Sequence, residues 1–424
     1  MSSDQLPELS RPLESHTISR RRFLQGSALV GFSAFLAACT GSSTESSAPG
    51  TISIPTAPPL SPTPEPSPTP LPKPTGPLMF ANWPAYIDLS GKAYDTEVYT
   101  PGSSPTIEQF KKEYGIDVQY VEAIEDNKIF YAKIQPQLQA GASTGWDLIV
   151  VTDWLAAKII SLGWAEQIDH GDVPNAVANL VDSLKNQPWD TGNDFHYPWQ
   201  SGMTGIGFNT KVLAKAGIPE PKSLADLWKI KANKMSFLTE SRDTFGLGLL
   251  KLGKAADPSS PTILDDLQAV FDDIKPLVDA GLRFAGNEYL QDFAAKKTWA
   301  AMVWSGDLAS SGTEGDTFQV PEEGVMIWTD NMIIPKGAVN KYTAALMINF
   351  VYDPVIAAQV EDYVYYVCPV KGADAEIKKL DPGAETNPLI FPPADYVAKY
   401  HNFQFLSDEA EAKLDELYLE LSGG

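Results

Sequence analysis

The chain lacks most of the residue types and motifs from which enzymes build catalytic centres. Its 424 residues include only four histidines and two cysteines, Cys39 and Cys368. It has no phosphate-binding loop of the G-x-x-x-x-G-K-[ST] type and no G-x-G-x-x-G dinucleotide-binding motif. So few histidines leave little for acid–base chemistry or a histidine-rich metal site. We therefore predict that the protein is not an enzyme and has no catalytic residues, no metal and no cofactor.

The N-terminal region also lacks an apolar run of membrane-spanning length. The run from Gly26 to Ala38 has 13 residues, whereas a spanning helix needs about 20, so it is typical of a signal-peptide core. Ser19–Leu24 (SRRRFL) resembles the twin-arginine export signal, and Leu36–Cys39 (LAAC) resembles a bacterial lipobox. We predict a signal peptide over residues 1–38 and lipidation of Cys39.

Proline and small polar residues fill the segment that follows, residues 39–77. Its last 30 residues are rich in proline, and such a chain favours polyproline II at about 3.1 Å per residue, so it could hold a domain up to ~90 Å from an anchor. Two acyl chains make stable anchoring feasible. The predicted location is the extracytoplasmic face of a membrane, as an exported lipoprotein. A disordered tail with no tethering role is the alternative.

Positive charge is scarce. The chain carries 32 lysines and arginines against 54 acidic residues, a formal charge of −22, which becomes −23 when residues 1–38 are removed. Phosphate contacts need lysine and arginine, so we expect no nucleic-acid partner. With Cys39 acylated no internal disulfide remains, and Cys368 is expected to be a buried apolar side chain. We expect a monomer.

From residue 78 onward, short apolar strands alternate with amphipathic helices. This alternation predicts an α/β fold with mostly parallel sheets. The continuous apolar run 148–151 is typical of a strand buried on both faces. Strands are predicted at 78–80, 116–121, 148–151, 206–208, 235–238, 300–304 and 325–328, and helices at 105–114, 129–140, 154–162, 223–229, 245–252, 264–280, 341–352, 354–363 and from 407.

Aromatic and acidic residues recur where these strands end. Such clusters follow five predicted strands, at residues 82–86, 152–154, 240–243, 304–307 and 328–330. In open α/β sheets, ligands bind beyond the carboxyl ends of the strands. Tryptophan faces attract cations and carboxylates hydrogen-bond to ammonium groups, so the clusters favour an organic cation as ligand. For any single residue a core position or a helix cap remains the alternative.

Six segments carry a resemblance to the polyamine-binding (spermidine/putrescine) proteins of bacterial ABC importers. In this sequence they read FANWPAY, GIDV, WDLIV, TGIGFN, SLADLW and WTDNMIIP, at residues 80–86, 115–118, 146–150, 204–209, 223–228 and 328–335. The resemblance implies capture of putrescine or spermidine and delivery to permease subunits. It places ligand-binding side chains at twelve positions: Trp83, Tyr86, Thr152, Trp154, Glu240, Asp243, Trp304, Asp307, Trp328, Asp330, Tyr366 and Gln404.

Asp330 is implied as the principal amine-binding carboxylate, and Asp307 resembles the putrescine-type members. Pro84 departs from the family pattern, because the usual hydroxyl residue is missing, and residues 88–105 are an insertion. These departures leave open a receptor for another cationic or zwitterionic solute on the same fold. A third reading is an exported hydrolase with two acids, which predicts a carboxylate pair facing one bond, whereas a receptor predicts acids spread along a slot.

The implied fold is a two-lobed α/β periplasmic binding protein (type II), with two mixed sheets and a hinged cleft. Its N-terminal lobe comprises residues 78–202 and 329–367, and its C-terminal lobe residues 203–328 and 368–424. Closure around the ligand is expected to be a hinge motion between the lobes.

Overall fold

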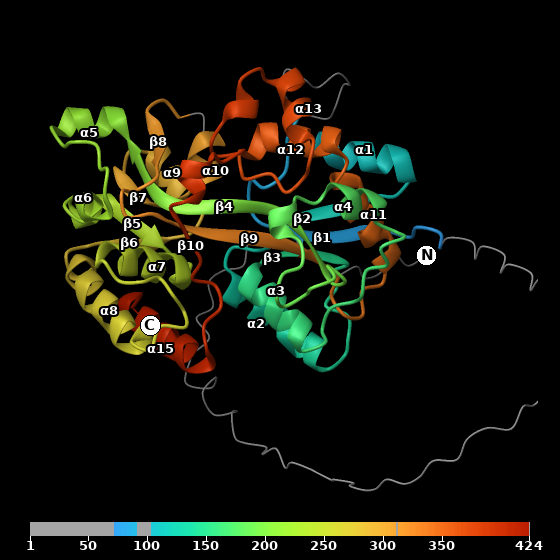
Figure 1. The fold of residues 1–424 in the computed structure, drawn as a ribbon, viewed down its shortest axis with the longest axis horizontal. Coiled ribbons are helices and arrows are strands. Elements are labelled where there is room, and N and C mark those ends of the chain that lie inside the picture. The colour runs from blue at the N-terminus through green and yellow to red at the C-terminus, as the bar shows by residue number, and fades with distance from the viewer. Residues whose placement is uncertain (1–71, 91–102, 311–312, 424) are drawn as a thin grey trace, which may run out of the picture. The chain divides into compact units, whose positions relative to one another are not determined.

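The computed structural model describes residues 72–90, 103–310 and 313–423 (Figure 1). These residues belong to the second of two units of the chain, Thr69–Gly424; the first is Met1–Pro68. The predicted signal peptide, Cys39 and the linker up to residue 71 lie outside the described residues, as do residues 91–102 of the insertion.

Ten strands form one mixed sheet. The order along the main path is β2-β1-β3-β9-β4-β7-β5-β6, while β10 pairs with β9 and β8 with β4. The pairs of β1 with β2 and β3, and of β5 with β6 and β7, are parallel; β9 is antiparallel to β3 and β4. The strands are β1 Leu78–Asn82, β2 Val118–Glu122, β3 Leu148–Thr152, β4 His196–Asn209, β5 Met235–Leu238, β6 Arg283–Ala285, β7 Ala300–Trp304, β8 Asp316–Gln319, β9 Val325–Ile333 and β10 Tyr400–His401.

The two long strands β4 and β9 join the halves of the sheet. Figure 1 shows them running from the group of β5, β6 and β7 to the group of β1, β2 and β3. All 14 residues of β4 are buried. At residue 202 the strand needs a glycine, because a Cβ there would lie 2.3 Å from the ring of Trp328 on β9. The sheet is mixed, as the family resemblance implied, but β4 and β9 join its halves into one sheet instead of the two that were predicted.

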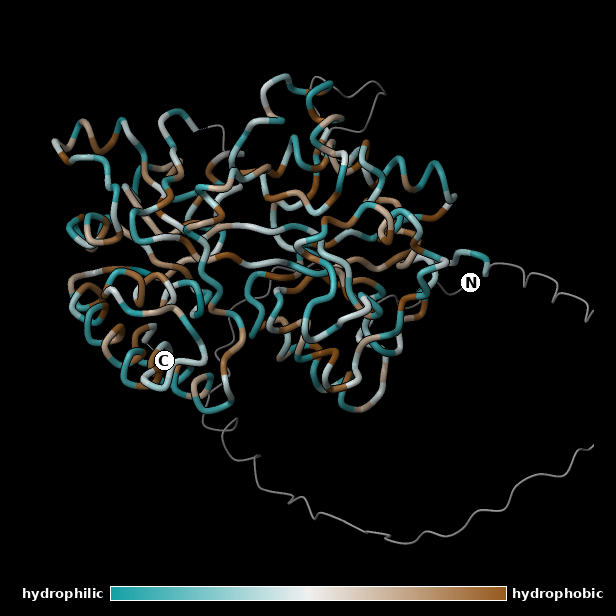
Figure 2. Tube along the Cα trace, in the orientation of Figure 1, coloured by the Kyte–Doolittle hydropathy of each residue, from teal (hydrophilic) through white to brown (hydrophobic). Residues whose placement is uncertain are grey.

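Helices cover both faces of the sheet (Figure 1). Figure 2 shows hydrophobic stretches along the strands and hydrophilic residues in the outer helices and turns, in keeping with a core centred on the sheet. The helices are α1 Pro105–Tyr114, α2 Asn127–Gln139, α3 Asp153–Ser161, α4 Pro174–Asn179, α5 Thr210–Ala216, α6 Leu224–Leu227, α7 Ser241–Lys251, α8 Ile263–Asp279, α9 Tyr289–Ala294, α10 Ser305–Ser310, α11 Lys341–Val351, α12 Pro354–Val364, α13 Ala373–Leu380, α14 Ala394–Val397 and α15 Asp408–Leu421.

Local sequence signals place several helix ends. Helix α1 begins after Ser104, whose side chain accepts a hydrogen bond from Ile107 N, and ends at Gly115 with φ 70°. Buried Asp88 ties the start of α1 to the chain before the insertion, because its carboxylate accepts hydrogen bonds from the Ser104 hydroxyl and Thr106 N. The helix is thus held in place from both sides of residues 91–102.

The α/β fold class is confirmed. Cys368 is buried, with 6% of its surface exposed, as expected. Across the described residues, no single helix is long and apolar enough to cross a membrane; one pair, α11 with α12, bent by 78°, reaches that length and composition together.

Candidate ligand-binding cleft

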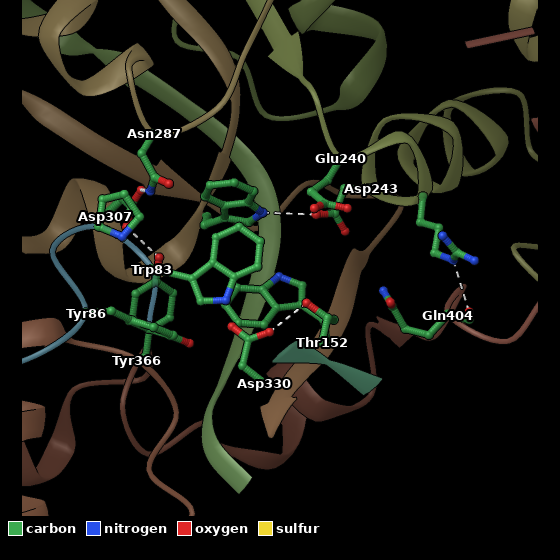
Figure 3. Close-up of a pocket in the computed structure, with 14 residues that line it drawn as sticks. Trp83, Tyr86, Thr152, Glu240, Asp243, Asn287, Asp307, Asp330, Tyr366 and Gln404 are labelled. Carbon is green, nitrogen blue, oxygen red and sulfur yellow. Dashed lines mark hydrogen bonds between the residues drawn. The ribbon is translucent and has the colours of Figure 1, made fainter. Parts of the chain in front are cut away.

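A cavity opens where the two halves of the sheet meet. About 480 Å³ of space between atoms lies within it, including space open to solvent. Its walls come from the carboxyl ends of β1, β3, β5 and β7 and from the middle of β9, as expected for an α/β sheet. The lining residues are Trp83, Pro84, Tyr86, Thr152, Glu240, Arg242, Asp243, Asn287, Trp304, Asp307, Trp328, Asp330, Tyr366 and Gln404 (Figure 3).

Eleven of the twelve predicted ligand-binding residues line this cavity, although they are spread from residue 83 to residue 404. The exception is Trp154 on α3. Its ring is covered by the guanidinium of Arg242, whose central carbon lies 3.9 Å from the ring centroid. Arg242 lines the cavity in this region, and Trp154 does not.

Three tryptophans are held by their indole N–H groups. Nε1 of Trp83 donates to Val150 O at 3.1 Å, Nε1 of Trp328 to Thr204 Oγ1 at 3.0 Å, and Nε1 of Trp304 to Asp243 Oδ2 at 2.9 Å. The rings of Trp83 and Trp304 meet edge to face with centroids 6.3 Å apart. With their polar edges satisfied, the rings offer apolar faces that can also attract a cation.

Asp330 is a buried carboxyl group on β9, opposite Thr152 at the end of β3. The Thr152 hydroxyl donates to Asp330 Oδ1 at 2.7 Å. Burial raises the pKa of Asp330 to about 7; the Thr152 and Tyr86 hydroxyls lower it, and the charges of Asp153 and Asp243 raise it. Such a carboxyl group gains much from a cationic partner, because its charged form is poorly solvated.

Asp243 is a second buried carboxyl group, in the first turn of α7. While Oδ2 accepts the Trp304 indole N–H, Oδ1 meets no hydrogen-bond donor among the described residues. Burial raises the pKa of Asp243 to about 6, against the opposing effects of the Trp304 indole, the Thr204 hydroxyl and the charge of Arg242. An unpartnered buried carboxylate oxygen in a cavity is a site for a ligand donor.

Asp307 is the best satisfied acid of the cleft. Its Oδ2 accepts from the Tyr289 hydroxyl at 2.6 Å and from Asn287 Nδ2 at 2.9 Å, and its Oδ1 accepts from the Tyr366 hydroxyl at 2.6 Å. Burial raises its pKa, and these three hydrogen bonds lower it. In Figure 3, Asp307, Asp330 and Asp243 lie at separate places round the indole of Trp83.

Glu240 lines the cavity, but protein donors already occupy one of its two oxygens. Its Oε1 accepts from the backbone N of Asn127 at 3.0 Å and from Asn127 Nδ2 at 3.1 Å. Burial raises its pKa to about 8, and the charges of Asp126 and Asp243 raise it further. Asn127 stands at the start of α2, on the far side of the cleft from α7.

Arg242 and Asn287 also line the cavity, although neither was among the twelve predicted ligand-binding residues. Arg242 is 4% exposed; its Nε donates to Gln404 O at 3.1 Å, and its Nη2 pairs with Glu411. Its Nη1 meets no acceptor among the described residues. A signal for Arg242 existed in its position between Glu240 and Asp243, whereas Asn287 enters only because the turn after β6 folds over the cleft.

No cluster of three or more potential metal ligands occurs among the described residues.

The run Gly141–Gly145 (GASTG) has the letters of a serine-hydrolase nucleophile motif. That motif needs a strand-to-helix turn, whereas Ser143 is an exposed residue between α2 and β3, where a helix leads into a strand. Its hydroxyl accepts a hydrogen bond from Gly145 N at 3.2 Å.

A mixed sheet covered by helices, with a cavity of aromatic and acidic side chains between its halves, defines a protein that binds a small ligand. The chain belongs to the family of bacterial extracellular solute-binding proteins, whose sequence profile matches residues 106–391. The resemblance predicted from the sequence is thereby confirmed.

Relatives with known roles match most of the chain. A spermidine/putrescine-binding periplasmic protein of Salmonella typhimurium is 29% identical over 82% of this chain and 92% of its own length. A putrescine-binding periplasmic protein of Escherichia coli is 30% identical over 69% of this chain and 81% of its own length. Among solved structures, a putative spermidine/putrescine ABC transporter protein from Listeria monocytogenes is similar with a TM-score of 0.67 and 25% identity, covering 81% of this chain and 98% of that one.

Proposed function

We propose that this protein is the extracytoplasmic receptor of an ABC importer, and that it captures a polyamine in the cleft and delivers it to the permease. The observation that carries the proposal is the pair Asp330 and Asp243, two buried carboxyl groups at separate places round the indole of Trp83 (Figure 3). Both line the cavity, together with the rings of Trp83, Trp304 and Trp328.

The ligand chemistry follows from the cost of burying charge. An ammonium group loses its hydration in the cleft unless a carboxylate pairs with it, so each amine of the ligand needs its own acid. The indole faces then cover the methylene groups that join the amines, and add cation–π attraction at the ends. Asp330 and Asp243 serve two amines in this scheme. The names of the relatives, which bind spermidine or putrescine, support the same class of ligand.

Asp307 supports a short diamine such as putrescine. Its carboxylate is held by Tyr289, Tyr366 and Asn287, so it presents fixed negative charge to one end of the cavity. A fixed acid favours an ammonium nearby without having to reorient. We infer that Asp307 favours a cation at that end of the cavity, while Asp330 and Asp243 pair with the two amines.

Ligand capture is proposed to close two lobes, residues 78–202 with 329–367 and residues 203–328 with 368–424. The chain crosses between them in β4, in β9 and near residues 366–369. In β4 and β9 the crossing segments pair directly, Gly202 with Trp328 and Ser201 with Thr329, and Ser201 also bridges to Val367. A bundle of three extended segments is a suitable hinge, because a small change at each turns the lobes as bodies.

We further propose that the protein is exported through the twin-arginine signal at residues 19–24 and held at the membrane by a lipid on Cys39, with residues 39–77 as the tether. Replacement of Cys39 by serine should release the protein from the membrane fraction while leaving ligand binding unchanged. Replacement of Arg20 and Arg21 by lysine should leave unprocessed precursor inside the cell.

A zwitterionic ligand is the second candidate, favoured by one observation. Arg242 lines the cavity with an Nη1 that meets no acceptor among the described residues. A ligand with an ammonium at one end and an oxygen acceptor at the other satisfies both Asp330 and Arg242. This candidate predicts tight binding of an ω-amino acid, which a polyamine site rejects because the carboxylate faces Asp243 or Asp307.

Calorimetric titration tests the function directly. The mature chain from residue 39, with Cys39 replaced by serine, is stripped of co-purified ligand and titrated with putrescine, cadaverine, spermidine and spermine. Lysine, arginine, betaine and 4-aminobutyrate are the controls. Sub-micromolar binding of one polyamine that is lost in Asp330→Ala supports the proposal. If no polyamine binds and an amino acid does, the second candidate replaces it.

A further inference from the structure

One side chain connects the proposed ligand carboxylate to the other side of the cleft. Asn127 is 1% exposed at the start of α2. Its Nδ2 donates both to Thr152 Oγ1 at 2.8 Å and to Glu240 Oε1 at 3.1 Å. Because the Thr152 hydroxyl donates in turn to Asp330, hydrogen bonds run without a gap from Asp330 through Thr152 and Asn127 to Glu240.

Further hydrogen bonds hold the Asn127 side chain in this chain of hydrogen bonds. Thr152 N donates to Asn127 Oδ1 at 3.2 Å, so the Asn127 amide is fixed in one orientation. The backbone N of Asn127 adds a second donor to Glu240 Oε1, at 3.0 Å. Glu240 thus receives two hydrogen bonds from α2, on the opposite side of the cleft, and its accepting oxygen is occupied by the protein.

Neighbouring charges reinforce the same contact. Lys128, the next residue of α2, donates to Ser241 Oγ at 3.1 Å and pairs with Asp415 and, at 3.6 Å, with Glu411 on α15. Arg242 pairs with Glu411 as well, and stacks on Trp154 of α3. The starts of α2 and α3 therefore meet α7 and α15 through polar groups, not through an apolar interface.

We propose that Asn127, Lys128 and Glu240 form a latch between the two sides of the cleft, and that Glu240 sets ligand affinity by holding the cleft closed and not by binding an amine. Closure matters only if a ligand is enclosed, so the latch rests on the proposed function. Through Thr152 the latch is continuous with Asp330, so a cation that fixes Asp330 also fixes Asn127 in the orientation that engages Glu240.

Three variants separate a latch from an amine ligand. In Glu240→Gln the amide oxygen can still accept both Asn127 bonds, so polyamine affinity should fall by no more than about threefold. In Glu240→Ala two buried donors of Asn127 lose their acceptor, and affinity should fall about 10- to 30-fold. Lys128→Ala removes a partly exposed pair and should cost about 3- to 10-fold. Lys133→Ala, an exposed lysine on the same helix, is the matched control and should change nothing.

The losses should appear in the dissociation rate and should be equal for diamines and triamines, because the latch does not touch the ligand. If Glu240 binds an amine instead, Glu240→Gln loses as much affinity as Glu240→Ala, and the loss differs between ligands with different numbers of amines. That outcome overturns the proposal.

A distance measurement tests the latch without any ligand. Fluorophores on cysteines at the exposed positions 139 on α2 and 420 on α15 report the gap between the two sides. Lys128→Ala and Glu240→Ala should widen the mean distance in the empty protein, while Lys133→Ala should not. If the distance between the fluorophores widens in the two variants but no polyamine binds, the proposed function is wrong and the latch is supported. If polyamine binds and both variants keep the wild-type distance and affinity, the latch is wrong and the proposed function stands.

Discussion

Ligand binding should release protons, because the carboxyl groups of the empty cleft hold them near neutral pH. Asp330 has a pKa of about 7 and Asp243 of about 6, both raised chiefly by burial. A protonated acid is no counter-ion for an ammonium, so each group must ionise before it can pair. The amines of the ligand stay charged throughout, since their pKa is close to that of lysine, about 10.4.

The magnitude follows from linkage. Each acid weakens apparent affinity by a factor of one plus ten to the power of its pKa minus the pH. At pH 8 the product of the two factors is about 1, and at pH 5.5 it is about 33 times 4. Affinity for a diamine should therefore fall about 100-fold between pH 8 and pH 5.5. At pH 6.5 Asp330 is about three-quarters protonated and Asp243 about one-quarter, so binding should release about one proton.

Titration calorimetry at pH 6.5 in two buffers with different heats of ionisation counts the protons, and a pH series gives the affinities. Asp330→Asn is the control: its binding should be weaker but should vary only about fourfold over the same range, the share due to Asp243. Affinity that stays constant from pH 5.5 to 8, with no dependence on buffer, would refute the assignment of these two acids to the ligand.

Three further variants test the raised pKa of Asp330, the close pairing of β4 and β9, and the stabilising role of Asp190. The raised pKa of Asp330 means that the folded, ligand-free protein binds the proton of this group more tightly than the unfolded chain does. Asp330 therefore contributes stability at low pH, and this contribution is lost as the pH rises through about 7. In urea unfolding, the free energy of unfolding of the ligand-free wild type, relative to that of Asp330→Asn, should fall by about 2 kcal/mol from pH 5.5 to 8. Gly202→Ala should lower the melting temperature and weaken binding, because the added methyl group overlaps the ring of Trp328; equal melting temperatures would contradict the close pairing of β4 and β9. Asp190→Ala should lower the free energy of unfolding by about 3 kcal/mol in denaturant titration. The Asp190 carboxylate accepts hydrogen bonds from the backbone N of Asp194, Phe195 and His196 and from the His196 ring. The folded fraction of this variant should keep its affinity for the polyamine.

The sequence predicted β3, β5 and β7 well, but it gave only part of β4 and β9 and missed β6, β8 and β10. The run 148–151 and the strands 235–238 and 300–304 were found within a residue, because short apolar runs bounded by turns signal buried strands. For β4 only residues 206–208 of 196–209 were predicted. Its segment HYPWQSGMTG mixes polar residues, proline and glycine without alternation. In the structure these residues are buried, and β9 pairs with residues 196–204 of the strand while β7 pairs with residues 204–208.

The cleft was predictable as a set of residues but not as an arrangement. Strand-end clusters of tryptophan and acid, together with the family resemblance, named eleven residues that the structure gathers in one cavity. The twelfth, Trp154, is covered by Arg242, a contact between α3 and α7 that no local pattern reveals.

The sequence alone determined the class of fold, the family and the chemical character of the cleft, because apolar periodicity, strand-end residues and motif spacing are local properties of the chain. Only the tertiary structure decided which acid is open to a ligand. Asp243 keeps an unpartnered oxygen, Asp307 is held by two tyrosines, and Glu240 is taken by Asn127. These three differ by their neighbours across the fold, since hydrogen-bond partners and burial set the charge and availability of a carboxyl group.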